Sequence, residues 1–309
     1  MVRALGIQWN NNHVSSRSRC PCRTEARPGV YAGAPACVGM IQVEGVSYRY
    51  AHTDATALQS VSLEIKAGEV AGIVGPNGSG KSTLGRLIKG LLLPDDGRVL
   101  VDGLDTRTHT LDVRRLVGLV FQNPNNQMVN ATVEHEVAFG PENLGLPPGE
   151  IRFRVARALA QVGLESRRSN ECHSLSLANK QRVALAAVIA MEPRYLVLDE
   201  PTAWVEPRDR WPLLRSVVQW AAGRNVGLVL VTHRMEEAEL CGTLYGMLSG
   251  HMAASGTVDE VLGDAQVRRR LALEIPETFA LVRELRAAGV NVQPGPGGIE
   301  AIAEALCHS

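Results

Sequence analysis

The sequence predicts an α/β fold built around a mostly parallel β-sheet. Four short segments are continuously apolar, which is typical of strands buried on both faces of a parallel sheet: 70–74, 117–121, 195–198 and 226–231. The first of them leads through a glycine-rich stretch into a segment with helical periodicity, as expected where strands and helices alternate. A chain of 309 residues is long enough to bury the core that such a sheet requires.

The glycine-rich stretch satisfies the phosphate-binding pattern G-x-x-x-x-G-K-[ST]. Such a loop surrounds nucleotide phosphates with backbone N–H groups, and its glycines allow the close approach. The pattern predicts that Lys81 reaches the β- and γ-phosphates and that Ser82 binds Mg²⁺. The expected nucleotide-binding residues of the loop are Gly75, Pro76, Asn77, Gly78, Ser79, Gly80, Lys81, Ser82 and Thr83. Apolar residues at helical spacing then predict a helix that ends before Pro94: Leu84, Leu87, Ile88 and Leu91.

The other three apolar segments also end in polar residues. Segment 117–121 is followed by Gln122, segment 195–198 by Asp199 and Glu200, and segment 226–231 by Thr232 and His233. Ligands of parallel sheets bind beyond the carboxyl ends of the strands, so we expect these side chains to share one site with the glycine-rich loop.

The chemistry of these side chains suggests phosphoryl transfer to water, which depends mainly on positioning and charge neutralisation. We expect Asp199 to hold Mg²⁺ together with Ser82, and Gln122 to approach both the metal and the attacking water. Glu200 is expected to orient or deprotonate that water, and His233 to hydrogen-bond the γ-phosphate. The predicted catalytic residues are thus Lys81, Gln122, Glu200 and His233.

Composition excludes other classes of function. The formal net charge is zero and the pI is near neutral, so no overall field attracts nucleic acid. The longest apolar run, residues 183–191, is far shorter than the ~18 residues that span a bilayer. Six cysteines are scattered without a disulfide-like framework, which fits a reducing compartment. Residues 1–39 show little apolar periodicity and are expected to be a disordered extension, with Met40 as the physiological start.

With these motifs in place, the chain resembles the ATP-binding-cassette (ABC) family over about residues 41–262. Gln122 matches its Q-loop, Asp199 and Glu200 its Walker B motif, and His233 its switch histidine. Tyr50 matches the aromatic residue that stacks on adenine; the alternative is a tyrosine that fills a strand position. The resemblance implies ATP as the nucleotide and a P-loop NTPase core with a helical subdomain and a small C-terminal helical segment.

A narrower resemblance concerns the ATPase subunits of energy-coupling factor (ECF) transporters, which import vitamins or cobalt and nickel ions. Residues 121–127, 131–134 and 138–145 are similar to that group. The resemblance implies an ATPase domain at 40–265, whose helical subdomain at about 123–190 receives a transmembrane coupling subunit. It further implies a separate membrane subunit that selects the substrate, and a peripheral location on the cytoplasmic face of the cell membrane. The sequence of such an ATPase subunit therefore does not reveal which vitamin or metal ion is transported.

The tail, residues 266–309, resembles the small dimerisation segment that many ECF ATPases carry. A helix is expected after Pro276, with Phe279, Val282 and Leu285 on one face, up to Gly289. Further apolar residues at helical spacing follow a Pro-Gly-rich break: Ile299, Ile302 and Leu306. The alternative is an amphipathic tail packed on its own domain.

The chain departs from the ABC pattern in two motifs. The usual signature, Leu-Ser-Gly-Gly-Gln, is replaced at 175–179, where Ser176 is followed by Leu177, Ala178 and Asn179. The D-loop carries Glu206 where the family has aspartate. In the family both motifs act on the nucleotide held by the partner ATPase, whereas the motifs that act within one chain are intact here. We therefore expect an asymmetric heterodimer with a second ABC ATPase; the alternative is that the altered signature still works through Ser176 and backbone N–H groups.

Three functions follow from these observations. The first is a transport ATPase of an ECF-type importer, which intact Glu200 and His233 favour. The second is a switch that binds ATP and dimerises with little hydrolysis, which the altered signature favours. The third, a non-transport ABC ATPase that acts on DNA or ribosomes, is disfavoured by the neutral net charge.

Overall fold

The computed structural model describes residues 39–51, 55–290 and 302–303. The chain divides into two units, 1–33 and 34–309, and every described residue belongs to the second. The expected disordered extension at 1–39 therefore lies outside the described residues, apart from Gly39.

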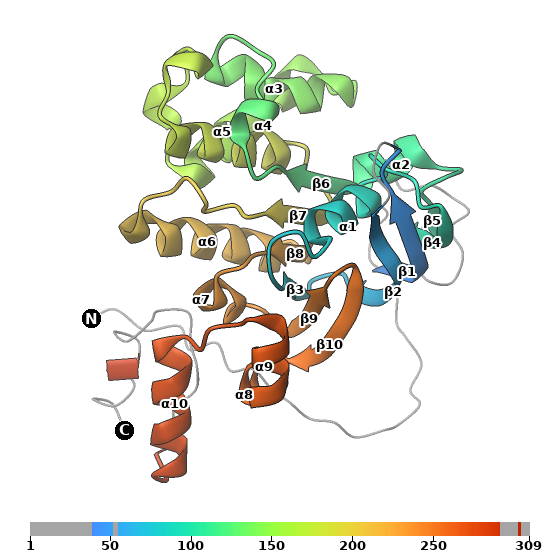
Figure 1. Ribbon diagram of the computed structural model, residues 1–309. Coiled ribbons are helices and arrows are strands. Elements are labelled where there is room, and N and C mark those ends of the chain that lie inside the picture. Colours follow the sequence, from blue (N-terminus) through green and yellow to red (C-terminus); the bar gives the residue numbers. More distant parts are fainter. Residues whose placement is uncertain (1–38, 52–54, 291–301, 304–309) are drawn as a thin grey trace, which may run out of the picture. The chain divides into compact units, whose positions relative to one another are not determined.

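A six-stranded sheet contains all four predicted strands (Figure 1). Its strand order is β10-β9-β3-β8-β7-β6, and only β10 runs antiparallel to its neighbour. The strands are β3 (Val70–Val74), β6 (Val117–Val120), β7 (Tyr195–Asp199), β8 (Gly227–Val231), β9 (Thr243–Leu248) and β10 (His251–Thr257). The predicted α/β fold with a mostly parallel sheet is thus confirmed.

The register of this sheet aligns the carboxyl ends of its central strands. Val120 pairs with Leu198, Leu198 with Leu230, and Ile73 with Val231. The residues that follow β3, β6, β7 and β8 consequently emerge at one edge of the sheet, where parallel sheets bind ligands.

The continuous apolar character of these strands has a clear cause in the packing. Along β7, Leu196 and Leu198 belong to one hydrophobic cluster, whereas Tyr195 and Val197 belong to another on the opposite face. All four side chains are buried, because successive residues of a strand point to opposite faces and both faces are covered.

Different helices contribute to the two clusters. Helix α1 (Lys81–Ile88) contributes Leu84, Leu87 and Ile88 to the cluster that contains Val197. The other cluster receives apolar residues from α3 (Val133–Asn143), α4 (Pro148–Val162), α5 (Leu177–Ala190) and α6 (Pro207–Ala222).

A second sheet, antiparallel and four-stranded, was not predicted from the sequence. Its order is β2-β1-β4-β5, formed by β1 (Met40–Arg49), β2 (Thr56–Lys66), β4 (Asp96–Val101) and β5 (Leu104–Asp105). Helix α2 (Thr110–Leu116) follows β5. The inward-facing residues of β2 join the same cluster as α1: Leu58, Val61, Leu63 and Ile65.

Helices α3, α4 and α5 pack on one another and lie within the predicted helical subdomain at about 123–190 (Figure 1). Thr132 caps α3 by accepting a hydrogen bond from the backbone N–H of His135, and Gly163 ends α4 in the left-handed conformation. The assignment of this region as a separate subdomain remains a prediction.

The C-terminal part contains α7 (Met235–Ala238), α8 (Val258–Gly263), α9 (Ala265–Leu271) and α10 (Glu277–Ala287). Helix α10 begins directly after Pro276, as predicted. Phe279 is buried in the same cluster as Leu196, and Val282 packs with Ile302 in a small cluster of its own. Dimerisation through this tail stays a prediction. The remaining predicted apolar residues, Ile299 and Leu306, lie outside the described residues.

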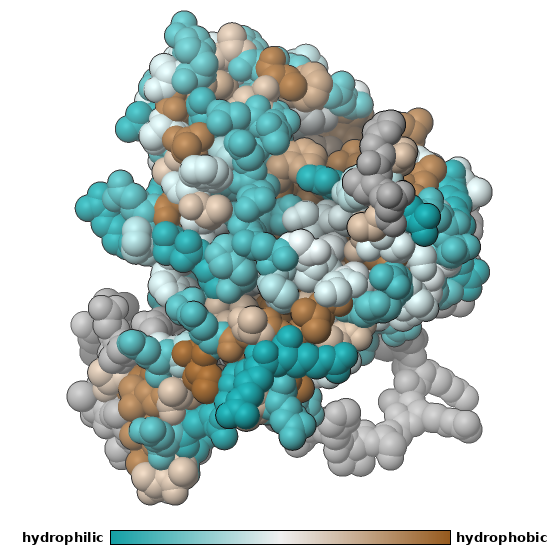
Figure 2. Space-filling view, in the orientation of Figure 1, coloured by the Kyte–Doolittle hydropathy of each residue, from teal (hydrophilic) through white to brown (hydrophobic). Residues whose placement is uncertain are grey.

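Among the described residues, no helix combines the length and the apolar character needed to cross a bilayer. On the face drawn in Figure 2, apolar residues occur in small groups between hydrophilic ones.

Candidate nucleotide-binding and hydrolysis site

The glycine-rich loop connects β3 to α1, and two of its glycines are required by their surroundings. Gly75 has φ +141°, and a Cβ there would lie 2.1 Å from the carbonyl oxygen of Met247. Gly80 has φ +101°, and a Cβ there would lie 2.6 Å from the carbonyl oxygen of Ala57. No larger side chain fits either position without moving the backbone.

Lys81 begins α1 and turns back across the loop. Its side chain is 5% exposed, and its Nζ donates hydrogen bonds of 2.8 Å to the carbonyl oxygens of both Gly75 and Pro76. Burial lowers the pKa of Lys81, while the nearby Glu200 and Asp199 raise it. A cation is thus held over the loop that the sequence predicts to bind phosphates.

Ser79 supplies an independent sign of a ligand. It is buried, and its Oγ has no hydrogen-bond partner among the described residues. Buried hydroxyl groups are normally paired, and an oxygen-rich anion in the loop would satisfy this one. The loop therefore fits a nucleotide phosphate.

Asp199, at the end of β7, lies directly beside the loop. Ser82 Oγ donates to Asp199 Oδ1 at 3.0 Å, although 117 positions separate the two residues. Burial raises the pKa of the Asp199 carboxyl, and the hydrogen bond from Ser82 opposes that shift. A hydroxyl oxygen and a carboxylate oxygen at this distance are the kind of ligands that Mg²⁺ accepts, so the pair fits the metal.

Glu200 is held between Gln122 and His233, two of the three other predicted catalytic residues. Its Oε2 accepts a hydrogen bond from Gln122 Nε2 at 2.7 Å, and its Oε1 lies 2.9 Å from His233 Nδ1. The backbone of Glu200 has φ +47°, and its N–H donates to the carbonyl oxygen of Val231 at 2.8 Å. A left-handed glutamate is strained, and such strain is concentrated at functional sites.

Tyr50 lies just beyond β1, and its hydroxyl contacts the start of α1. The hydroxyl lies 3.1 Å from Thr83 Oγ1 and accepts a hydrogen bond of 3.2 Å from Arg86 Nη1. Its ring meets that of Tyr48 edge to face, with centroids 5.0 Å apart. The structure thus brings Tyr50 next to the loop. Arg86, which sequence reasoning missed, had no signal beyond its place in the helix after the loop.

The altered signature lies on a different element. Ser176 is the N-cap of α5, and its Oγ accepts the backbone N–H of Asn179 at 3.4 Å. Leu177 and Ala178 form the first turn of that helix. In the part of the chain that the structure describes, no hydrogen bond or ion pair links the signature residues to loop 75–83.

Sequence reasoning also missed two contacts that support the site. The indole Nε1 of Trp204 donates to the carbonyl oxygen of Gln122 at 2.9 Å. The buried carboxylate of Glu237 accepts hydrogen bonds from the hydroxyls of Thr202 and Thr232, and burial raises its pKa. Trp204 carried a signal, since it stands where the family has glycine, whereas nothing in the sequence marked Glu237.

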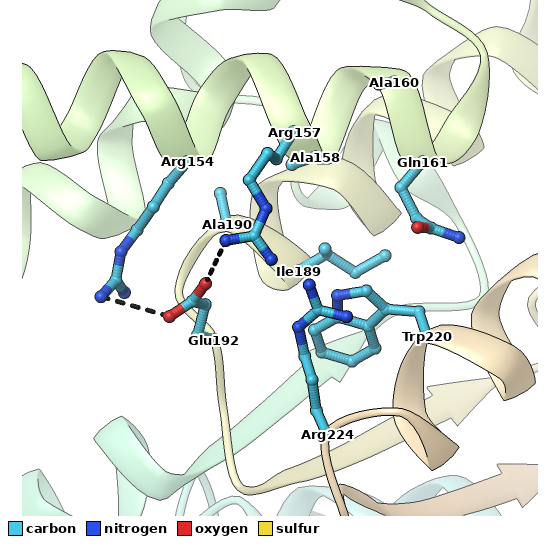
Figure 3. A pocket seen from close by; sticks show the side chains of 10 residues that line it. All are labelled: Arg154, Arg157, Ala158, Ala160, Gln161, Ile189, Ala190, Glu192, Trp220 and Arg224. Carbon is cyan, nitrogen blue, oxygen red and sulfur yellow. Dashed lines mark hydrogen bonds and ion pairs between the residues drawn. The ribbon is translucent and has the colours of Figure 1, made fainter. Parts of the chain in front are cut away.

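A pocket of about 380 Å³ lies elsewhere, between α4, the end of α5 and the end of α6 (Figure 3). Glu192 pairs with Arg154 at 3.3 Å and with Arg157 at 3.4 Å, and Arg224 stacks on the ring of Trp220. The first two contacts link α4 to the end of α5, the third lies at the end of α6, and none of the predicted site residues lines the pocket.

Comparison with known proteins agrees with the geometry. Residues 58–203 match the family described as ABC transporter. The chain is 45% identical over 277 residues to the energy-coupling factor transporter ATP-binding protein EcfA1 of Symbiobacterium thermophilum, covering 87% of this chain and 96% of that protein. It is 39% identical over 256 residues to the cobalt import ATP-binding protein CbiO of Syntrophus aciditrophicus, covering 82% of this chain and 91% of that protein.

Two solved structures also resemble this chain. CbiO1 of Clostridium perfringens, described as part of the ABC transporter complex cbiONQ, matches with a TM-score of 0.67 and 35% identity, over 80% of this chain and 99% of that one. The cassette MJ0796, solved as a post-hydrolysis dimer bound to ADP and phosphate, matches with a TM-score of 0.65 and 26% identity, over 71% of this chain and 98% of that one. The chain therefore belongs to the ABC transporter ATPases, in the group of energy-coupling factor ATP-binding proteins.

Proposed function

We propose that this chain hydrolyses ATP to drive uptake of a vitamin or transition-metal ion by an ECF-type importer. The observation that carries the proposal is the pair of contacts at the strand ends. Ser82 meets Asp199 at 3.0 Å, and Glu200 is held between Gln122 and His233. Both contacts stand next to a loop shaped for phosphates.

Each residue has a role that its position supports. Lys81 neutralises phosphate charge from within the loop, and Tyr50 stacks on the adenine ring. Ser82 and Asp199, with Gln122 nearby, would hold Mg²⁺, which would supply charge neutralisation on the phosphate oxygens. Glu200 orients the attacking water and accepts its proton, and His233 hydrogen-bonds the γ-phosphate.

The partners follow from the relatives and from the signature. The relative CbiO1 is described as part of a complex, cbiONQ, which supports a peripheral place beside membrane subunits on the cytoplasmic face. The helical region at about 123–190 is the proposed contact for the coupling subunit. Because Leu177 and Ala178 replace the signature glycines at the start of α5, we infer that a second ABC ATPase completes the hydrolysing site.

The substitution Glu200→Gln tests this proposal in the purified complex. It keeps the shape of the side chain but removes the proton acceptor, so ATP turnover and substrate uptake should fall by at least about a hundredfold. ATP binding should be retained, because Glu200 lies outside the loop that holds the phosphates. Radiolabelled uptake, phosphate release and equilibrium ATP binding measure the three quantities.

Glu64→Gln, on an exposed position of β2, is the matched control and should leave all three unchanged. Unchanged turnover in Glu200→Gln would remove Glu200 from the mechanism and contradict the proposed function.

A second candidate is a switch that binds ATP and dimerises with little hydrolysis. The leucine at the first position of α5 favours it, because a bulky side chain obstructs close contact between backbone N–H groups and a partner's phosphate. The same variant separates the two functions, since a switch requires ATP binding only and would retain its effect on the partner in Glu200→Gln.

A further inference from the structure

Trp204 occupies an unusual position beside the site. It lies in the turn after β7, and its indole N–H reaches across to the carbonyl oxygen of Gln122, which follows the neighbouring strand β6. The indole is 44% exposed, so burial of the ring does not account for its placement. The directional contact of the indole is the hydrogen bond to Gln122.

The turn that carries Trp204 is itself fixed relative to Glu200. The backbone N–H of Ala203 donates to the carbonyl oxygen of Glu200 at 3.1 Å, and that of Val205 donates to the carbonyl oxygen of Thr202 at 3.0 Å. Val205 is buried and the Thr202 hydroxyl donates to buried Glu237, so both anchor the turn to the core. A rigid turn places the indole at a defined distance from the Glu200 backbone.

Gln122 is consequently held at both ends. Its carbonyl oxygen accepts from Trp204 at 2.9 Å, while its side-chain Nε2 donates to Glu200 Oε2 at 2.7 Å. Its side chain is exposed, and in the described part of the chain no other hydrogen bond fixes its amide. Loss of the indole would remove the hydrogen bond to the main chain at 122, and with it a constraint on the amide that contacts Glu200.

We propose that Trp204 is a positioning residue for ATP hydrolysis, acting through Gln122 on the carboxylate of Glu200. The proposal rests on the catalytic roles given to Gln122 and Glu200 in the proposed function. A displacement of about 1 Å in a group that positions reactants can cost up to about a hundredfold in rate, so a single hydrogen bond remote from the phosphates matters.

The test is a double-mutant cycle in the purified complex, with Trp204→Phe, Gln122→Ala and the double variant. Phenylalanine retains an aromatic ring and removes the N–H donor. We expect Trp204→Phe to lower kcat about three- to tenfold, the effect of one net hydrogen bond, with little change in KM for ATP. Because Trp204 acts through the Gln122 side chain, Trp204→Phe should cause no further loss once Gln122→Ala is present.

Two controls distinguish a positioning role of Trp204 from a purely structural role. Trp211→Phe, in α6, removes another partly buried indole and should leave kcat unchanged. The thermal unfolding midpoint of Trp204→Phe should fall by no more than about 4 °C, the effect of one lost hydrogen bond, so a loss of kcat measured well below that midpoint does not come from unfolding.

Several outcomes would overturn the inference. An unchanged kcat in Trp204→Phe, or an equal loss with and without Gln122→Ala, removes the proposed route through Gln122. A rise in KM with constant kcat would place Trp204 in nucleotide binding instead. If Gln122→Ala and Glu200→Gln themselves leave turnover intact, the proposed function fails, and this result is distinguishable from a failure of Trp204 alone.

Discussion

At the scale of single residues, the site depends on backbone conformations that side chains cannot adopt freely. Gly75 and Gly80 have positive φ values and lie against backbone carbonyls of other segments, while Gly78 has φ +77° and open space around it. Glu200 adopts a positive φ despite its side chain. Loop glycines and a strained glutamate thus define where the phosphates and the attacking water are expected.

Alanine substitutions at two of these glycines should lower the free energy of unfolding by different amounts. Gly78→Ala should cost only about 1 kcal/mol of unfolding free energy, because its strain is limited to the backbone angle. Gly75→Ala should cost about 3 kcal/mol or more, because a Cβ also meets the Met247 carbonyl at 2.1 Å. Urea unfolding of both variants measures the difference, and equal losses would mean that the loop moves away from Met247 at no cost.

Part of the site could be predicted residue by residue, and part could not. The loop, Asp199, Glu200 and His233 follow local rules, because each directly follows an apolar strand whose direction fixes its edge. The contact between Trp204 and Gln122 depends on the path of a turn and on the spacing of β6 and β7, which no local pattern specifies. Glu237 was missed for the same reason, since its partners Thr202 and Thr232 follow two different strands.

At the scale of elements, the four strands with continuous apolar runs were recognised, whereas β9 and the half-exposed strands were not. Strand β2 buries alternate residues, but its pairing with β1 changes register near Val46 and again near Tyr48. Such irregularities interrupt the period of two on which strand prediction depends. The four predicted strands lack this difficulty, because a continuous apolar run remains visible in any register.

Lys89, at the end of α1, ties three elements together and should make stability depend on pH. Its Nζ donates to the carbonyl oxygens of Arg114 and Val117, at the end of α2 and the start of β6. Burial lowers its pKa to about 8, from 10.5. Between pH 8 and 10 the unfolded chain therefore binds more protons at this residue than the native one, so the free energy of unfolding contributed by Lys89 rises with pH.

From pH 7 to 10, this rise should amount to roughly 2 kcal/mol. Lys89→Met should remove it, as measured by urea unfolding at a series of pH values. The same gain in wild type and in Lys89→Met would show that Lys89 is not the group responsible.

At the scale of the whole molecule, the chain combines an intact set of motifs for its own nucleotide with an altered set for that of a partner. The loop, Gln122, Glu200 and His233 lie together at the carboxyl edge of the six-stranded sheet. The altered signature begins α5, in the helical region. This division favours an asymmetric assembly, in which the loop of this chain pairs with an intact signature from a second ATPase.

The most direct test is steady-state ATP turnover by the purified chain alone and with its partner ATPase present. Alone, the chain should bind ATP but hydrolyse it slowly, because Leu177 and Ala178 obstruct the partner's phosphate in a homodimer. Replacing both with glycine should raise that turnover at least about tenfold, and the partner ATPase should raise it without any substitution. Robust turnover by the unmodified chain alone, abolished by Glu200→Gln, would contradict the asymmetric account.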